Sequence, residues 1–126
     1  MAYRTSRENF TRLAEQALEE LPEEFRKYFT NISIIIEDRP SKGECKKIGV
    51  GQDDLLGLFR GTEYPQKGGF FDIPPSLPDE IVLYQKNIEA ICSSERELIE
   101  EIRLTLVHEV GHYFGLSEEE LGKYEP

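Results

Sequence analysis

Residues 108–112, with the sequence His-Glu-Val-Gly-His, combine residue types that bind a metal ion and move a proton. A helix turns by about 100° per residue, so His108 and His112 project from one face on successive turns and can share one cation. Glu109 lies beside this pair and can take a proton from a metal-bound water, as the HExxH pattern requires of its general base. Zinc lowers the pKa of that water towards neutrality, so hydroxide becomes available for attack on a carbonyl. The two histidines of the chain both lie here, which apolar packing does not require.

A catalytic zinc ion usually has three protein ligands and one open position, so the motif needs a third ligand. Because the chain has no third histidine, a carboxylate is the natural substitute. In one common geometry a glutamate on a second long helix completes the site, but only fourteen residues follow His112. In the other geometry a glycine three residues after the second histidine ends the helix, and the third ligand lies six residues after that histidine. Gly115 and Glu118 occupy these positions, in the pattern HExxHxxGxxE.

The third ligand and the supporting groups have alternatives. Residues 118–120 are all glutamate, which also suits the first turn of a helix because the helix dipole favours acids there. Glu119 is therefore a substitute ligand, with Asp72 behind it. Tyr113, Tyr84 or a backbone carbonyl are candidates for an oxyanion partner or for the group that orients a histidine.

The motif is predicted to lie on a long helix that opens at Ser94. Ser94 and Glu97 have the spacing of a capping box, in which hydroxyl and carboxylate satisfy backbone amides at a helix start. A wide apolar face makes this the central buried helix, and its members are Leu98, Ile99, Ile102, Leu106, Val107 and Val110. Gly115 ends it, because glycine adopts the left-handed conformation without steric strain. A second capping box, Ser117 with Glu120, starts a last short helix.

Apolar periodicity predicts the elements of the first third of the chain. Residues 6–20 form an amphipathic helix, which Pro22 ends or redirects, and residues 23–29 restart a short helical turn. Residues 32–36, Ile-Ser-Ile-Ile-Ile, indicate a strand buried on both faces. Residues 38–47 have the proline, glycine and alternating charges of an exposed loop.

The middle of the chain contains two further short apolar segments. Residues 55–59 form a candidate edge strand, in which Gly57 marks a bulge or a close approach by another chain. Residues 61–79 hold three glycines and four prolines, and so long a connection is mobile or functional. Residues 80–84 form the third strand, and residues 87–92 follow as a short helical turn.

Length, charge and cysteine content restrict the class of protein. At 126 residues we expect one domain over residues 1–126. The net charge of −10 repels phosphate backbones and anionic lipids, so we expect neither nucleic acid nor a membrane surface as a partner. The polar N-terminal stretch lacks the apolar run of a secretion signal, so the expected location is cytoplasmic. Cys45 and Cys92 form no CxxC and are expected to be reduced thiols.

These segments resemble the minimal zincins, small bacterial zincin-like metallopeptidases long catalogued only as a domain of unknown function. The resemblance spans most of the chain. Its segments are LEELPEEF at 18–25, IEDRP at 36–40, LGLFRG at 56–61, IVLY at 81–84 and HEVGHYFGLSE at 108–118. The last segment is the most specific.

The resemblance implies an α+β, minimal zincin-like fold. In that fold a small, three- to four-stranded mixed sheet packs on an N-terminal helix and a central HExxH helix, and Zn²⁺ lies between that helix and the following turn. Zinc-dependent peptidase activity is also implied. Members of the family usually carry aspartate at the position of Glu118, and larger relatives with the glycine turn place a methionine beneath the metal, whereas the only methionine here is Met1.

The predicted mechanism is hydrolysis of a peptide bond by a metal-activated water. His108, His112 and Glu118 hold Zn²⁺, and Glu109 deprotonates the bound water and later protonates the leaving amine. The metal polarises the scissile carbonyl.

A peptide or protein substrate is expected to lie extended beside an exposed strand edge, pairing its backbone with the sheet. Leu56, Gly57 and Leu58 are the predicted substrate-binding residues. Two alternatives remain: a non-catalytic zinc-binding or interaction protein that retains the fold, and a zinc hydrolase of small amides. The sequence predicts neither the cleavage specificity nor the oligomeric state.

Overall fold

The structure is a computed structural model that describes residues 2–60, 79–113, 115 and 119. Its strands are β1 (Ile32–Glu37), β2 (Gly57–Arg60) and β3 (Asp79–Tyr84). Its helices are α1 (Arg7–Glu19), α2 (Glu23–Arg26), the 3-10 helix η1 (Lys27–Phe29), α3 (Lys42–Ile48), α5 (Gln85–Ala90) and α6 (Glu95–Tyr113). The strands form a mixed sheet in the order β1-β3-β2, with β1 parallel and β2 antiparallel to β3. This is the predicted α+β fold.

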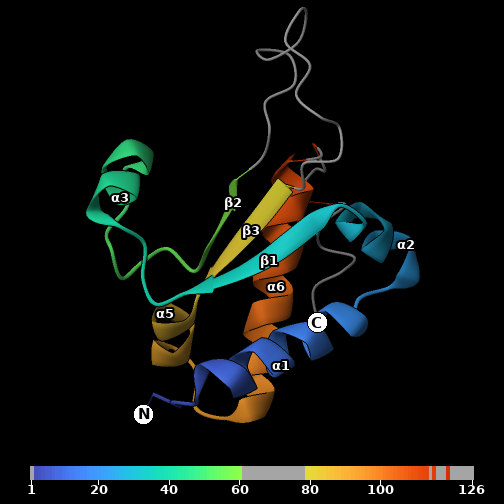
Figure 1. Cartoon of the computed structure of the whole chain (residues 1–126), viewed down its shortest axis with the longest axis horizontal. Coiled ribbons are helices and arrows are strands. Elements are labelled where there is room, and N and C mark those ends of the chain that lie inside the picture. The colour runs from blue at the N-terminus through green and yellow to red at the C-terminus, as the bar shows by residue number, and fades with distance from the viewer. Residues whose placement is uncertain (1, 61–78, 114, 116–118, 120–126) are drawn as a thin grey trace, which may run out of the picture.

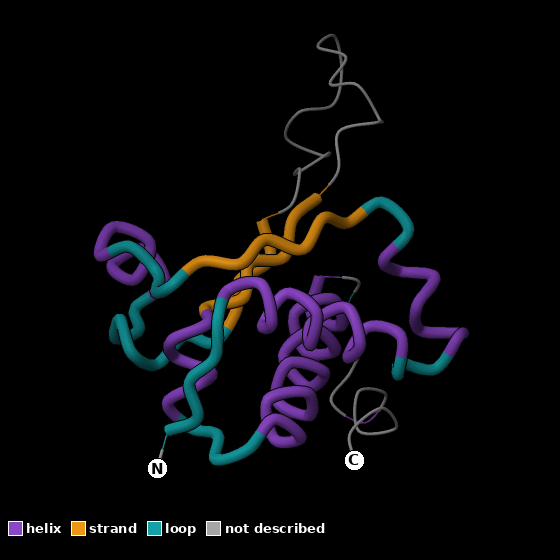
Figure 2. Tube along the Cα trace, turned by 60° about the horizontal axis from the view of Figure 1, so that its bottom comes forward, coloured by secondary structure: helices purple, strands orange, loops and turns teal. Residues whose placement is uncertain are grey.

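Helices α1 and α6 pack against each other on one side of the sheet (Figure 1; Figure 2). Helix α1 begins at Ser6, whose hydroxyl accepts the N–H of Asn9 at 3.0 Å. Its buried residues are Phe10, Leu13, Ala14 and Ala17. Phe25 and Phe29 of the next two short helices join the same core, so the predicted first helix and helical turn are confirmed.

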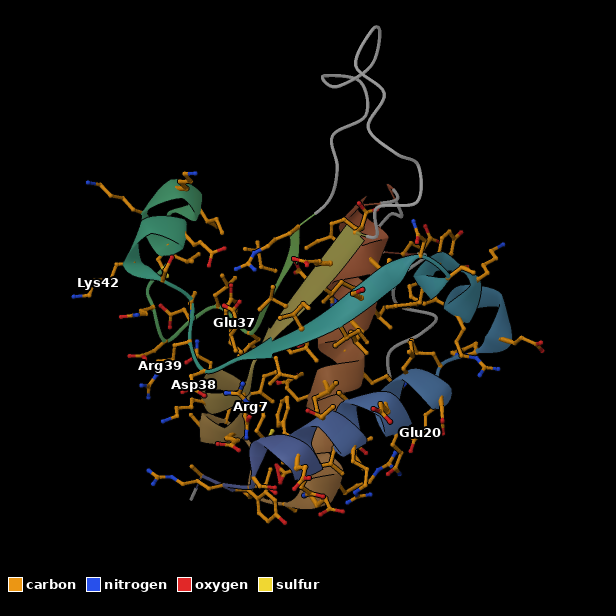
Figure 3. All side chains as sticks on the ribbon, viewed as in Figure 1. Arg7, Glu20, Glu37, Asp38, Arg39 and Lys42 are labelled. Carbon is orange, nitrogen blue, oxygen red and sulfur yellow. The ribbon has the colours of Figure 1, made fainter. Side chains whose placement is uncertain are left out.

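Polar contacts anchor both ends of α1. At its start, the guanidinium of Arg7 donates to the Ile36 carbonyl at 3.0 Å and forms an ion pair with Asp38 at the end of β1. At its end, Glu20 accepts from Arg96 of α6 at 3.1 Å. Figure 3 shows Arg7 and Asp38 close together and Glu20 at the opposite end of the helix. Helix α1 is thereby attached to both the sheet and α6.

Helix α6 has the predicted cap and buried face. The Ser94 hydroxyl accepts the Glu97 N–H at 3.2 Å, and the Glu97 carboxylate accepts the Ser93 N–H at 3.2 Å. All six predicted apolar residues are buried, namely Leu98, Ile99, Ile102, Leu106, Val107 and Val110. Gly115 follows the helix with a left-handed φ of 73°, as predicted.

The prediction that residues 32–36 form a strand buried on both faces was wrong in its burial. Every residue of β1 is partly exposed, because β1 is an edge strand of the described sheet and pairs only with β3 there. The doubly buried strand is β3, in which residues 81–84 are all fully buried. Burial of a strand depends on its neighbours in space, which its own composition does not specify.

The prediction of an exposed loop over residues 38–47 was also wrong, because α3 forms there. The Ser41 hydroxyl accepts the Glu44 N–H at 3.1 Å, and Gly49 closes the helix with a φ of 84°. These are local start and stop signals that outweigh Pro40 and Gly43. Figure 1 shows α3 standing apart from α1 and α6.

The remaining predicted elements divide between confirmed and undescribed. Strands β2 and β3 confirm the second and third predicted strands, and α5 begins two residues before the predicted turn at 87–92. The loop at 61–78, and the last helix with Ser117 and Glu120, lie outside the described residues. In the part of the chain that the structure describes, no helix has the length and apolar character needed to cross a bilayer.

Candidate active site

Strand β2 lies along α6, and the two run in the same direction. Gly57 contacts Thr105 of the helix, and Phe59 contacts Glu109. Two residues of strand advance by about 6.6 Å and four residues of helix by about 6 Å, so the two rises match. Glu109 is therefore placed beside the last part of a strand.

Gly57 permits this close approach. A Cβ at Gly57 would lie 2.5 Å from Thr105 Cγ2 and 3.0 Å from the Val82 carbonyl oxygen. The sequence offered a bulge or a close approach by another chain as the reason for this glycine. The structure shows that the approaching element is α6, within the same chain.

Backbone alternation shows which groups of β2 face away from β3. The Tyr84 N–H donates to the Leu56 carbonyl at 2.9 Å, so the backbone of Leu56 points towards β3. The backbone N–H and C=O groups of successive residues point to opposite edges of a strand. Those of Leu58 therefore also point towards β3, whereas those of Gly57 and Phe59 point to the outer edge of β2, the side away from β3. The predicted edge strand is therefore confirmed for the described sheet.

Glu109 reaches this outer edge. The Phe59 N–H donates to Glu109 Oε1 at 3.1 Å. This hydrogen bond spans 50 positions in sequence and joins the candidate general base to the strand. It holds the carboxylate beside the place where an added strand would pair with β2.

His108 is oriented by its own helix. Its Nδ1 lies 3.0 Å from the Leu104 carbonyl oxygen, one turn earlier in α6. A carbonyl can only accept, so Nδ1 carries the hydrogen in this contact and Nε2 keeps its lone pair. A second hydrogen bond that fixes the tautomer is the usual support of a metal-ligating histidine. The structure thus selects the backbone carbonyl among the anchors that the sequence left open.

A shallow pocket lies between the start of β2 and α6. Its volume is about 240 Å³, and its described lining is Leu55, Leu56, Gly57, Glu101, Leu104, Thr105, His108 and Glu109. Asn87 holds one wall in place, because its amide donates to the carbonyls of Gln52 and Leu55, both at 2.8 Å. The pocket therefore opens directly beside the candidate base and the first histidine.

The structure brings some predicted site residues together and leaves others outside. His108 and Glu109 share the pocket with Leu56 and Gly57 of the predicted substrate-binding set. Leu58 is not among the described lining residues.

Other predicted site residues lie elsewhere or outside the described part of the chain. Tyr84 lies elsewhere, since its hydroxyl donates to Glu44 of α3. His112 belongs to α6 one turn after His108, but its side chain, Glu118 and Asp72 are outside the described part.

Sequence reasoning missed Leu104 and two polar residues of the pocket, Glu101 and Thr105. Together with His108 the two polar residues are spaced i, i+4 and i+7, which places all three on one face of the helix. Polar residues at this spacing on the helix that carries the motif were the available signal.

Residues 29–125 match the zincin-like metallopeptidase family, so the chain belongs to that family. No curated protein matches it significantly. A conserved hypothetical protein from Thermus thermophilus has a similar structure, with a TM-score of 0.56 and 23% sequence identity over 87% of this chain and 94% of that one. This likeness supports the fold. Family membership implies zinc in general terms.

The donor set is suited to zinc. Two histidines one helical turn apart, the first with its Nε2 lone pair kept available, supply borderline-soft nitrogen ligands of the kind zinc prefers. Among the described residues no three His, Cys, Asp or Glu side chains gather into a group that could hold a metal ion. The His112 side chain and Glu118, which the motif needs, are outside that part of the chain.

Proposed function

We propose that this chain is a zinc-dependent metallopeptidase that hydrolyses peptide bonds of substrates bound in extended form. The observation that carries the proposal is the hydrogen bond from the Phe59 N–H to Glu109 Oε1, at 3.1 Å. Glu109, the proposed general base of the HExxH motif, thereby lies at the outer edge of a strand, where a peptide backbone can pair. Membership in the zincin-like metallopeptidase family supports the same reaction class.

His108, His112 and Glu118 are the residues that would hold the zinc ion. Bound zinc would supply a Lewis acid that polarises the scissile carbonyl and makes water more acidic. The Leu104 carbonyl orients His108 for this role by accepting from Nδ1. Glu119 remains the substitute for Glu118.

Glu109 is the residue that moves the proton. Its carboxylate takes a proton from the attacking water and delivers it to the nitrogen of the leaving amine, so that the proton is conserved over the cycle. The bond from Phe59 keeps Oε1 at the edge of β2, so this carboxylate is oriented by the strand on which the substrate lies.

The substrate would pair with the outer edge of β2. Gly57 and Phe59 are the residues whose backbone groups face that side, and Leu56 lines the adjoining pocket. Because the Phe59 N–H is already donated to Glu109, the Phe59 carbonyl and the Gly57 backbone groups are the ones that would pair with the substrate. Leu58 would contribute only by holding β2 on β3, since its own backbone groups point inwards. An added strand is recognised through its backbone, which suits a peptide better than a small amide.

Metal content is the first experiment. Untagged wild type, His112→Ala and Glu118→Ala are purified and analysed for zinc. We expect near one zinc per chain in the wild type, loss in His112→Ala and weakened retention in Glu118→Ala. A wild type that neither contains zinc nor takes it up on addition contradicts the proposal.

Glu109→Gln then separates a peptidase from a binding protein. Glutamine keeps an oxygen that can accept the Phe59 N–H, so the fold and zinc content should be retained. Cleavage of a mixed peptide library should fall by about 10²–10⁴-fold. Glu100→Gln is the control with the same charge change, at a partly exposed position of the same helix that pairs with Arg96. Equal cleavage by both variants, or cleavage of short acylated amides in preference to peptides, overturns the assignment.

A further inference from the structure

The pocket beside the candidate base contains a carboxylate that the proposed reaction does not use. Glu101 lies on α6 seven residues before His108, which corresponds to about 10.5 Å along the helix axis. It is half-buried and lines the same pocket as His108 and Glu109. The pocket therefore has the proposed chemistry at one end and a negative charge at the other.

The Glu101 carboxylate has no hydrogen bond or ion pair within the described part of the chain. The backbone carbonyl of Glu101 accepts the Thr105 hydroxyl at 2.9 Å. By contrast, the carboxylates of Glu20 and Glu44 are paired, with Arg96 and Arg60 respectively. A half-buried carboxylate without a partner is destabilised by lost hydration, and a bound cation would restore that energy. Burial raises the pKa of Glu101, and the His108 ring, when it is protonated, partly opposes this shift.

The remaining lining is suited to an aliphatic stem. Leu55, Leu56 and Leu104 supply apolar surface, and the Thr105 Cγ2 methyl lies against the Gly57 backbone. Lysine and arginine combine a hydrocarbon stem with a charged end, and they bury the stem while the end keeps a polar partner. The apolar walls of the pocket suit the stem of such a side chain, and the Glu101 carboxylate suits its charged end.

We infer that Glu101 is a specificity-determining residue that selects a lysine or arginine side chain of the substrate, an inference that rests on the proposed peptidase function. An antiparallel peptide on the outer edge of β2 runs from Phe59 towards Leu55, because β2 runs the other way. The cleaved bond of this peptide would lie near Phe59 and Glu109. The substrate residues that pass over Leu55 and Glu101 are then C-terminal to that bond. An extended chain covers about 10.5 Å in about three residues, so the basic residue lies within three positions of that bond.

The local effect of Glu101 must be separated from the general attraction of an acidic protein for basic peptides. The chain has a net charge of −10, which favours any cationic substrate through its long-range field. Glu100→Gln changes the net charge by the same amount as Glu101→Gln, from an adjacent position that is not among the described residues lining the pocket. A specific role predicts different results for the two variants.

The test uses quenched fluorescent peptides that carry lysine, norleucine or glutamate at each of the three positions after the cleaved bond. Zinc-loaded wild type should cleave the best lysine peptide about fivefold or more faster, in kcat/KM, than its norleucine counterpart. Glu101→Gln should lose this preference, and Glu101→Lys should favour glutamate instead. Glu100→Gln should keep the wild-type preference. Thermal unfolding confirms that each variant is folded.

Failure of the inference and failure of the proposed function give different results. Cleavage without a lysine preference, or a preference that Glu101→Gln retains, overturns the inference and leaves the peptidase assignment intact. Absence of cleavage by zinc-loaded wild type refutes the peptidase assignment. In that case the anisotropy of the same labelled peptides with Glu109→Gln protein measures binding: lysine selectivity that depends on Glu101 supports the pocket assignment, and equal binding overturns it.

Discussion

Replacing Gly57 with alanine should destabilise the protein and disturb the candidate site together. The added Cβ would lie 2.5 Å from Thr105 Cγ2, a separation that real Cβ atoms essentially never show. It would also lie 3.0 Å from the backbone oxygen of Val82, in the central strand. Thr105 cannot simply rotate away, because its hydroxyl donates to the Glu101 carbonyl at 2.9 Å. The strand must therefore move away from α6.

Overpacking of this kind costs about 1–3 kcal/mol of unfolding free energy. For a chain of this length each kcal/mol lowers the melting temperature by about 3–6 °C, so a fall of at least about 3 °C is expected. Phe59 is two residues further along β2, so its N–H should move away from Glu109 and zinc-dependent cleavage should fall as well.

The assay is thermal and urea unfolding of a double-mutant cycle of Gly57→Ala and Thr105→Ser. Serine retains a hydroxyl for the Glu101 carbonyl and lacks the methyl group that the new Cβ meets. Thr105→Ser should cost stability in the wild type and restore part of it in Gly57→Ala, with a coupling energy of about 0.5 kcal/mol or more. Unchanged stability of Gly57→Ala, or strict additivity of the two substitutions, would refute the close-approach explanation.

Three further predictions concern the stability and reactivity of other elements. Burial alone would raise the pKa of Glu44, but Arg60, 2.8 Å away, holds that pKa below its ordinary 4.5. Because the pKa of Glu44 is lowered in the folded state, its contribution to the unfolding free energy is present above pH 4.5 and is lost as pH falls through the folded-state pKa. In urea unfolding across this range, the unfolding free energy of Arg60→Met should therefore fall less steeply with pH than that of the wild type. Ser94→Ala should lower the unfolding free energy by about 1 kcal/mol, because it removes the hydroxyl that caps α6, whereas Ser94→Thr should retain most of it; equal stability of Ser94→Ala and wild type would contradict the cap. Burial raises the pKa of Cys92 to about 11, so this thiol should react with a disulfide reagent at about pH 8 only after denaturation, and rapid labelling of the native protein would disprove its burial.

Features that depend on neighbours in sequence were predicted well. The six predicted apolar residues of α6 are buried as helical spacing requires, and its cap follows from Ser94 and Glu97. The pairing of His108 with Glu109 on one helix also needs only local geometry, since successive positions of a helix have fixed directions. The missed helix α3 carried the same kind of signal in Ser41 and Gly49. The prediction of a loop gave the composition of this segment more weight than these two residues.

Features that depend on packing were not available from the sequence. Strand β1 has the more uniformly β-branched sequence, yet β3 is the buried strand, because the order of strands decides which one has two neighbours. The Tyr84 hydroxyl likewise lies near Glu44 because of the face of β3 on which Tyr84 stands, which the sequence does not specify.

The sequence by itself determined the helix and the residue types of the candidate site, and it indicated zinc chemistry, because each depends on spacings of a few residues along one helix. Only the tertiary structure decided that Phe59 donates to Glu109, 50 positions away, and that Gly57 brings the strand against Thr105. These contacts join elements whose approach is set by side-chain volume and backbone pairing across the whole domain. The position of Glu101 in the pocket has the same origin, since a helix face becomes a pocket wall only when another element lies opposite it.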